Sequence, residues 1–246
     1  FTFAPGSSIA ECYRDQGSDL ALVMGILGLP LTDGRFREAL SLFPAFGIEI
    51  EFAIDNFKGA RHPNSIMIEA ETEGGGILTA VADSTGGGAF TLHALNGCQV
   101  DISGDAYYLF VESELPPDSG SFDGYGTVTR HENGFLLTSP YDIPPETVDK
   151  LRAAPGVSSL RAAEPVFYPI RGRALYKDGR EMIEYARERG ISLGETALEY
   201  ESALLDMPKD ELDREMERRL SVMERAVALG LSDGSPRMSL LAPTAK

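Results

Sequence analysis

The chain has 246 residues, and its hydrophobic content of 43% supports one large domain or two small ones with a packed core. Its 22 basic and 38 acidic residues give a net charge of −16, which argues against binding of a nucleic-acid backbone. No apolar run approaches the roughly 20 residues needed to cross a bilayer, and no basic segment precedes an apolar one at the N-terminus. We therefore expect a cytoplasmic protein that binds neither nucleic acid nor membrane.

The chain has few side chains that commonly bind transition metals. Its two cysteines, Cys12 and Cys98, lie far apart; reduced thiols are expected in the cytoplasm, and a disulfide is the alternative. Two thiols cannot by themselves complete a four-cysteine zinc or iron–sulfur site. The three histidines are His62, His93 and His131. We therefore expect no metal site built from this chain alone, although carboxylates could contribute to one.

Residues 1–112 alternate short strands with two helices. The chain opens on Phe1-Thr2-Phe3, which is typical of a strand already under way, so we expect the natural start to lie upstream. The apolar run 18–28 predicts one helix, and Asp33 can cap a second. Glycine-rich turns between neighbouring strands predict antiparallel hairpins. The predicted strands are Ile48–Ile54, Ser65–Thr72, Ile77–Ala82, Ala89–Leu95 and Tyr107–Glu112.

Residues 113–123 have the composition of a linker, and a strand–strand–helix–strand unit follows up to residue 170. Its predicted elements are Tyr125–His131, Gly134–Ser139, a helix from Pro144 or Pro145 to Ala154, and Val157–Ile170. Residues 171–246 are predicted to be largely helical. Capping-box patterns begin at Asp178 and Ser192, and Gly190 sits where a helix C-cap belongs.

The stretch from His62 to Val111 carries the strongest binding signal. Proline forces the residue before it into an extended conformation, so the His62 ring should point away from the strand that it introduces. Ser84 and Thr85, beside three glycines at 86–88, could bind a carboxylate through hydroxyl and N–H donors. Each pattern also has a plain alternative, which is a locally bonded loop histidine in the first case and a tight sheet corner in the second. His93 and His131 are interpreted as structural.

Ordered motifs in this stretch and before it resemble those of bacterial iron–sulfur L-serine dehydratases. The run from Gln16 to Gly28 resembles the family's Gly-Thr-Asp-x-Ala-x-Val-x-Gly-Leu-Leu-Gly helix. His62-Pro63-Asn64-Ser65 resembles the family's His-Pro-Asn-Thr, and Ser84-Thr85-Gly86-Gly87-Gly88 resembles its Ser-Ile-Gly-Gly-Gly. Leu95-Asn96-Gly97 and Ser103-Gly104 follow in the same order. The resemblance covers residues 7–112 and implies the family's β-chain domain, similar in fold to the allosteric substrate-binding domain of some phosphoglycerate dehydrogenases.

An ACT domain follows in the family's β chain, and residues 113–170 resemble its second half, with the linker in place of its first helix. Residues 171–246 resemble the start of the family's α chain, through Leu198-Glu199-Tyr200-Glu201 and residues 220–227. The implied fold is therefore α+β in three parts. These are a serine-dehydratase β-like domain with a mixed sheet and helices (1–112), a linker and partial ACT-like unit (113–170), and a helical segment (171–246).

The chain also departs from the family's pattern. The family's Ser-Ser-Ser-His-Thr loop would lie upstream of Phe1, and the cysteines that bind its cluster would follow Lys246. The loop Ser-Gly-x-Thr-Gly-Gly corresponds here to residues 239–244, which lack the glycines. We therefore expect no cofactor within this chain, and a 4Fe–4S cluster on a cysteine-bearing α-like partner chain or on a missing α portion.

The resemblance implies a component of an ammonia-lyase that converts L-serine, or a related β-substituted amino acid, to a 2-oxo acid and ammonia. The alternative is a non-catalytic amino-acid-binding or regulatory module derived from this family. In both cases the expected ligand is a small amino acid, and assembly into a homo-oligomer stays open. No catalytic residue is assigned. The candidates for substrate binding or domain contact are His62, Asn64, Ser84, Thr85, Gly86, Gly87, Gly88 and Ser239.

Overall fold

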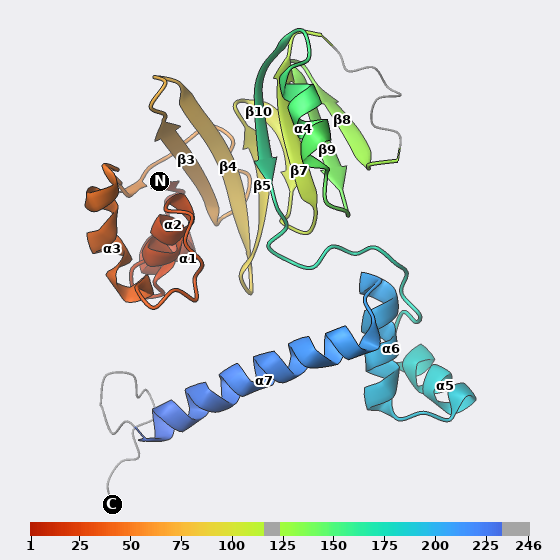
Figure 1. Ribbon diagram of the computed structural model, residues 1–246. Coiled ribbons are helices and arrows are strands. Elements are labelled where there is room, and N and C mark those ends of the chain that lie inside the picture. The colour runs from red at the N-terminus through yellow and green to blue at the C-terminus, as the bar shows by residue number, and fades with distance from the viewer. Residues whose placement is uncertain (116–123, 233–246) are drawn as a thin grey trace, which may run out of the picture. The chain divides into compact units, whose positions relative to one another are not determined.

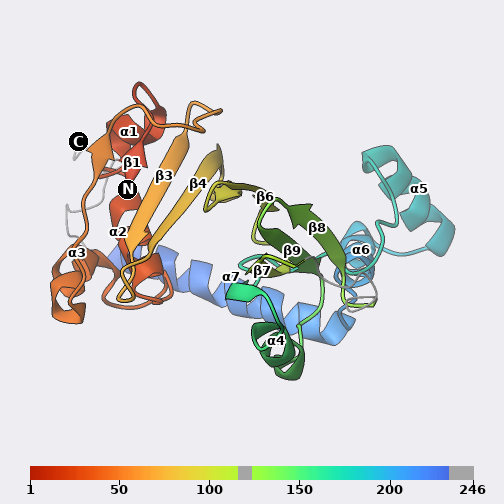
Figure 2. The ribbon, with the colours of Figure 1, turned by 90° about the horizontal axis from the view of Figure 1, so that it is seen from above.

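The computed structural model describes residues 1–115 and 124–232 and divides into two compact units, Phe1–Pro169 and Ile170–Lys246. The first unit contains two β-sheets with helices, and the second contains helices (Figures 1 and 2). The α+β class predicted from the sequence is confirmed. No helix in the described part of the chain is long and apolar enough to cross a membrane.

The first sheet has the strand order β2-β1-β3-β4-β5-β6. From β3 onward its neighbours are antiparallel and joined by short turns, whereas β1 lies between β3 and a parallel partner, β2. The pairing of β3, β4, β5 and β6 is therefore set by the short turns that join them. The strands are β1 (Thr2–Phe3), β2 (Ala53–Ile54), β3 (Ser65–Glu71), β4 (Ile77–Gly86), β5 (Ala89–Leu95) and β6 (Cys98–Ile102).

Three helices of the first unit gather on the β1–β3 side of this sheet (Figures 1 and 2). Ser7 begins the first of them, since its side chain accepts a hydrogen bond from the Ala10 N–H at 3.0 Å. Val23, Met24 and Ala39 are fully buried where the other two pack together. The elements are α1 (Ser8–Cys12), α2 (Ser18–Ile26) and α3 (Ala39–Leu42), the last flanked by 3-10 turns η1 (Phe36–Glu38) and η2 (Phe43–Phe46).

The second sheet has the strand order β10-β7-β9-β8, with every neighbouring pair antiparallel. Strand β7 is buried on both faces. Tyr108 and Phe110 pack into a cluster with side chains of the first sheet, whereas Leu109 and Val111 pack into a cluster with side chains of α4. The elements are β7 (Tyr107–Ser113), β8 (Thr127–His131), β9 (Gly134–Ser139), α4 (Pro145–Arg152) and β10 (Val157–Ala163).

The second unit contains α5 (Gly179–Arg189), α6 (Leu193–Leu205) and α7 (Lys209–Ser232). The predicted capping box at the start of α6 is confirmed, because Ser192 and Glu195 bond to each other's backbone N–H groups. Gly190 ends α5 in the left-handed conformation with φ 65°, as predicted. The side chain of Asp178 caps α5, but Glu181 accepts from the Lys177 N–H, so the full box does not form there.

Some boundaries predicted from the sequence are wrong. Strand β10 ends at Ala163 rather than Ile170, because Pro165 and Pro169 cannot donate to a strand ladder. The helix predicted after Asp33 is broken into α3 and two 3-10 turns, with Pro44 in the second turn. Strand β6 was not predicted. The strand expected at Ile48–Ile54 is reduced to β2, because its partner β1 is only two residues long.

The boundary between the first two predicted regions also moves. Strand β7 was assigned to the first region, but it pairs with β9 and β10 of the second sheet. Its apolar sequence fits either sheet, and only the tertiary pairing decides between them. Of the predicted linker, Ser113 ends β7, and residues 116–123 lie outside the described part of the chain.

Gly126 provides a test of the second sheet. A Cβ added there would overlap the carbonyl oxygen of Thr138, so Gly126→Ala should force the β8–β9 hairpin apart. We expect the free energy of unfolding to fall by about 2 kcal/mol in urea denaturation. Gly74→Ala is the matched control, because a Cβ at Gly74 meets nothing within 4 Å. Equal stability of the two variants would contradict the close approach of the strands.

Candidate functional site

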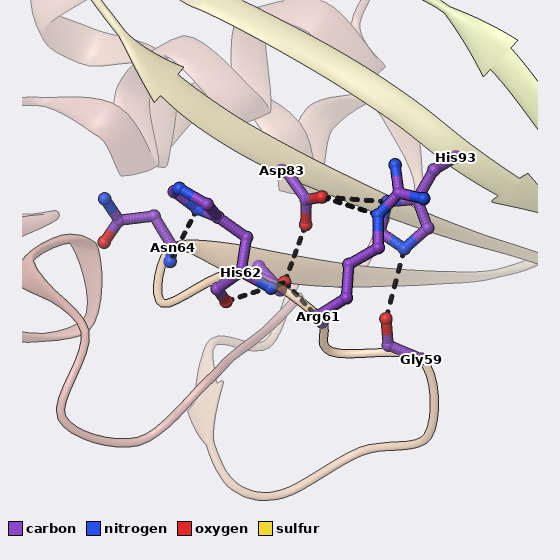
Figure 3. A network of polar contacts seen from close by, with 7 residues as sticks. Gly59, Arg61, His62, Asn64, Asp83 and His93 are labelled. Atoms are coloured by element: carbon purple, nitrogen blue, oxygen red, sulfur yellow. Dashed lines mark hydrogen bonds and ion pairs between the residues drawn. The ribbon is translucent and has the colours of Figure 1, made fainter.

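A buried carboxylate on β4 organises the polar groups at one end of the first sheet (Figure 3). Ser65 lies directly across from Asp83 on β3, and its hydroxyl donates to Asp83 Oδ1 at 2.6 Å. Arg61 Nε donates to the other carboxylate oxygen at 3.0 Å. His93 on β5 places its Nδ1 3.2 Å from that same oxygen. Residues from two neighbouring strands and from the loop before β3 therefore converge on one carboxylate.

These partners set the ionisation of Asp83. Burial alone would raise the pKa of its carboxyl group, and it is the largest single influence. The hydrogen bonds from Ser65 and Arg61, together with the charges of His93 and Arg61, outweigh burial and lower the pKa below 3.8. Asp83 is therefore a buried anion that is paired and hydrogen-bonded, as a buried charge must be.

His93 joins this carboxylate to the loop that precedes β3. Its Nε2 lies 3.1 Å from the carbonyl oxygen of Gly59 on one side, and its Nδ1 faces Asp83 on the other. Nδ1 lies close to the Asp83 carboxylate but does not form an aligned hydrogen bond with it. Both neighbours are acceptors, so the ring holds the loop to the sheet from β5.

Asp83 also fixes the His62-Pro63-Asn64 turn. The Ser65 hydroxyl that donates to Asp83 accepts a hydrogen bond from the His62 N–H at 3.1 Å. The His62 ring is not part of the buried cluster, because its Nδ1 accepts from the Asn64 N–H at 3.1 Å (Figure 3). In the neutral ring this acceptor role leaves the proton on Nε2, which has no hydrogen-bond partner in residues 1–115 and 124–232.

Asn64 connects three elements. Its Oδ1 accepts from the Ser8 hydroxyl at 2.9 Å and from the Ile9 N–H at 3.4 Å, at the start of α1. Its backbone carbonyl accepts from the Ser84 N–H at 3.0 Å, at the end of β4. The Asn64 amide nitrogen has no partner among the described side chains and backbone groups. The two motifs singled out in the sequence thus meet directly, although 20 positions separate Asn64 from Ser84.

The three glycines after Thr85 form the β4–β5 turn. Gly86 pairs with Ala89, and Gly87 and Gly88 between them have φ values of 62° and 83°. Two central residues with positive φ are typical of a tight hairpin turn that favours glycine. A Cβ at any of the three would meet nothing within 4 Å. The glycines are therefore explained by the backbone conformation and not by close contact with the described chain. The geometry fits the sheet-corner alternative, and residues 85–88 are exposed.

An apolar cavity of about 520 Å³ opens beside the turn, between the sheet and the first two helices. Ser84 and Gly88 line it together with apolar side chains that include Leu22, Ile66 and Phe90. His62 and Asn64 are not part of its lining. A ligand in the cavity would therefore meet the turn but not the histidine.

The candidate residues on the described part of the chain lie at one end of β3 and β4, whereas Ser239 lies outside the described residues. His131 is on β8 of the second sheet, where its ring packs at a tilt against Phe110 and burial lowers its pKa. Sequence reasoning did not identify Arg61, Ser65 or Asp83 as part of the site. The sequence contains one signal for Asp83. It is an acidic residue directly after the apolar run 77–82, a position where a strand usually buries its side chains.

The described residues do not fit a four-iron cluster. They contain no group of three or more histidine, cysteine, aspartate or glutamate side chains that could hold a metal ion. Both cysteines are free thiols: Cys12 Sγ donates to the Ser8 carbonyl oxygen at 2.7 Å, and Cys98 is buried in the core. Burial raises the pKa of the Cys98 thiol, which opposes the thiolate form that a cluster requires.

The chain is similar to two proteins of known classification. It is 35% identical over 99 residues to a "Probable L-serine dehydratase, beta chain" of Bacillus subtilis, covering 40% of this chain and 44% of that protein. It is 29% identical over 136 residues to the "L-serine dehydratase, beta chain" of Peptoniphilus asaccharolyticus, covering 55% of this chain and 57% of that protein. The chain thus spans about half the length of these relatives. No protein-family model matches it. The resemblance to serine dehydratase β chains is confirmed.

The role of Asp83 as a buried anion can be tested by measuring how the free energy of unfolding changes as the pH falls below neutral. Because its pKa is lowered on folding, Asp83 stabilises the protein above pH 3.8, and this contribution is lost as the pH falls through the lowered value. Asp83→Asn should cost about 3 kcal/mol at neutral pH by leaving Arg61 and His93 without their anion. Between about pH 5 and pH 2 the variant should lose less stability than the wild type.

Urea denaturation at several pH values measures both effects. Asp101→Asn is the matched control, because Asp101 is exposed on the neighbouring strand β6. If the free energy of unfolding of the Asp83→Asn variant falls with acid as steeply as that of the wild type, Asp83 is not the buried anion.

Proposed function

On the premise that the chain is related to L-serine dehydratase β chains, we propose that it is the β component of an L-serine dehydratase-like ammonia-lyase. The enzyme converts L-serine, or a related β-substituted amino acid, to a 2-oxo acid and ammonia. The observation that supports this role is the hydrogen bond between the Asn64 carbonyl and the Ser84 N–H, which joins the two motifs shared with the family. The role of this chain is to bind and orient the amino acid from one side.

The groups left uncommitted around this junction suit a carboxylate. His62 Nε2, the Asn64 amide and the Ser84 and Thr85 side chains can donate hydrogen bonds. Arg61 adds a cation: its Nε is committed to Asp83, but its side chain is 55% exposed, so the outer guanidinium nitrogens can reach an anion. The Asp83 network holds the loop that carries His62 and Asn64 to the sheet.

We assign the iron–sulfur cluster to a cysteine-bearing α-like chain, or to a further part of the protein. When bound there, the cluster supplies Lewis-acid chemistry at the leaving group. The residues that the structure describes do not fit the cluster, so no step of the elimination is assigned to them. Their contribution is substrate binding and the contact surface for the catalytic part.

A second candidate function is favoured by the order of the second sheet. Numbered from β7, its strands lie in the order fourth, first, third, second, which is the order of a β-α-β-β-α-β unit. On this interpretation β7 supplies the first strand, and the unit is ACT-like. Such a unit would make the chain an amino-acid-binding regulatory module, with or without a catalytic partner.

The amide of Asn64 provides the sharpest test of the lyase proposal. Asn64→Asp keeps an oxygen for the bonds from Ser8 and Ile9 but removes the uncommitted NH₂ donor and adds a negative charge. With a cysteine-bearing α-like chain present, we expect kcat/KM for L-serine to fall at least tenfold, measured as pyruvate formation under anaerobic conditions. The melting temperature should change little, since the internal hydrogen bonds remain.

Asn56→Asp is the matched control, because Asn56 is exposed in the loop before β3. Wild-type activity of the Asn64 variant would remove this residue from the substrate site. If the chain gives no lyase activity with any α-like chain, calorimetric titration of the full chain with free amino acids tests the second candidate. Saturable binding of an amino acid by the chain alone would then support the regulatory module.

A further inference from the structure

A cavity of about 320 Å³ opens on the α4 side of the second sheet and shares no residue with the candidate site. Its walls come from the start of β7, the loop before α4, α4 itself and the end of β10. Helix α4 packs on this face of the sheet (Figure 1). Each wall is continued by described chain on both sides, and the volume is that of a small-molecule site. We call this space the α4 cavity.

The floor of the α4 cavity is apolar. Leu109 and Ile143 are buried there, and Val148 packs against the same cluster from α4. Tyr107 adds a half-buried aromatic ring at the start of β7. A ligand therefore gains affinity by placing an apolar body on this floor, where nonpolar surface is removed from water.

The register of the sheet adds a carboxylate to the same face. Ala162 pairs with Leu109, so the side chain two residues further along the chain, that of Glu164, comes beside Tyr107. Both Glu164 and Tyr107 line the cavity. The Glu164 carboxylate therefore lies at the edge of the apolar floor and not on the opposite face of the sheet.

Two more carboxylates line the cavity from other elements, Asp142 in the loop before α4 and Asp149 on α4 itself. Asp149 is partly neutralised by Arg152, whose guanidinium lies 3.1 Å away. Asp142 and Glu164 are exposed and form no ion pair within the described part of the chain. No lysine, arginine or histidine is among the described residues that line the cavity. Its rim is therefore negative.

The start of α4 does not reverse this charge. The N-terminus of a helix carries a partial positive charge, but Glu146 lies in the first turn of α4 and offsets it. A negative rim over an apolar floor is complementary to a ligand with a positive group on an apolar body. A free amino acid fits less well, because its carboxylate would be repelled by the same rim.

We propose that the α4 cavity binds a small organic amine, with its ammonium group between Asp142 and Glu164 and its apolar body on the floor. Charge-assisted hydrogen bonds to the two carboxylates supply the selectivity, and burial of the body supplies the affinity. The Tyr107 ring adds attraction for an ammonium group placed against it. The inference goes beyond the proposed lyase activity and does not depend on it, since the cavity contains neither Asn64 nor Ser84.

The test uses the full chain and three ligands that share one aromatic ring. Phenylethylamine carries only the positive group, phenylethanol is its neutral counterpart, and phenylalanine carries a carboxylate as well. Titration followed by NMR should give a dissociation constant for phenylethylamine at least tenfold lower than for either of the others. The amide signals of Asp149 and Ala162 should shift on binding, and that of Thr129 on β8 should not.

Variants that remove charge separate the cavity from the general acidity of the protein. Asp142→Asn combined with Glu164→Gln should weaken binding of phenylethylamine at least tenfold. Asp101→Asn combined with Glu132→Gln removes two exposed carboxylates elsewhere and should weaken it less than twofold. Equal weakening by the two pairs would mean non-specific attraction by the net charge of −16 and would overturn the proposal.

A further variant tests the space itself. Ala162 is exposed on the edge strand β10 and lines the cavity. Ala162→Phe should therefore fill the cavity and weaken binding at least tenfold with both carboxylates in place. Thr129→Phe, on the edge strand β8, is the matched control and should leave binding unchanged. Wild-type affinity of the Ala162 variant would place the amine elsewhere on the surface.

Three results with the wild-type chain would also overturn the proposal. The first is no binding of phenylethylamine at all. The second is equal binding of phenylethanol, which would remove the carboxylates from recognition. The third is equal binding of phenylalanine, which would assign the cavity to amino acids and support the regulatory module. None of these readouts involves catalysis, so the proposal and the lyase assignment fail independently.

Discussion

The burial of β7 on both faces is the constraint on which the first unit depends. Tyr108 and Phe110 complete the core of the first sheet, whereas Leu109 and Val111 complete the core beneath α4. A strand buried on both sides must have its backbone paired on both edges, and β9 and β10 provide that pairing. Neither sheet has a complete core without this strand. The two sheets therefore form one compact unit from Phe1 to Pro169.

Polar contacts at the end of β7 reinforce the same junction. The Glu112 carboxylate accepts from the Asn96 amide in the β5–β6 turn at 3.0 Å and from Arg161 on β10 at 2.6 Å. Burial raises the pKa of Glu112, but the hydrogen bonds from Ser159, Asn96 and Arg161 outweigh it and lower the pKa overall. The contact is local, yet it connects a turn of the first sheet with an edge strand of the second.

Sequence reasoning succeeded where the structural signal is local. The bounds of β5 and β9 were predicted to the residue, because turn residues on both sides define those strands. It failed where a distant partner decides the outcome. Nothing in the sequence of β7 states which sheet it joins, and of the strand predicted at Ile48–Ile54 the structure forms only β2. The candidate site follows the same rule. Local motifs identified His62 and Ser84, whereas the role of Asp83 depends on its contacts with Ser65 and His93 on the neighbouring strands.

The last helix, α7, has little tertiary packing along most of its length. Helix α7 has 24 residues and is therefore about 36 Å long, but Leu212 is its only buried side chain among the described residues. Most of its length is held by its own backbone and by internal ion pairs, such as those through which Arg218 and Arg219 lower the pKa of Glu215 to about 2. Helices without tertiary packing are only marginally stable in water. The half of α7 beyond Met216 should therefore follow helix–coil behaviour, melting gradually with temperature instead of sharing the cooperative transition of the sheets.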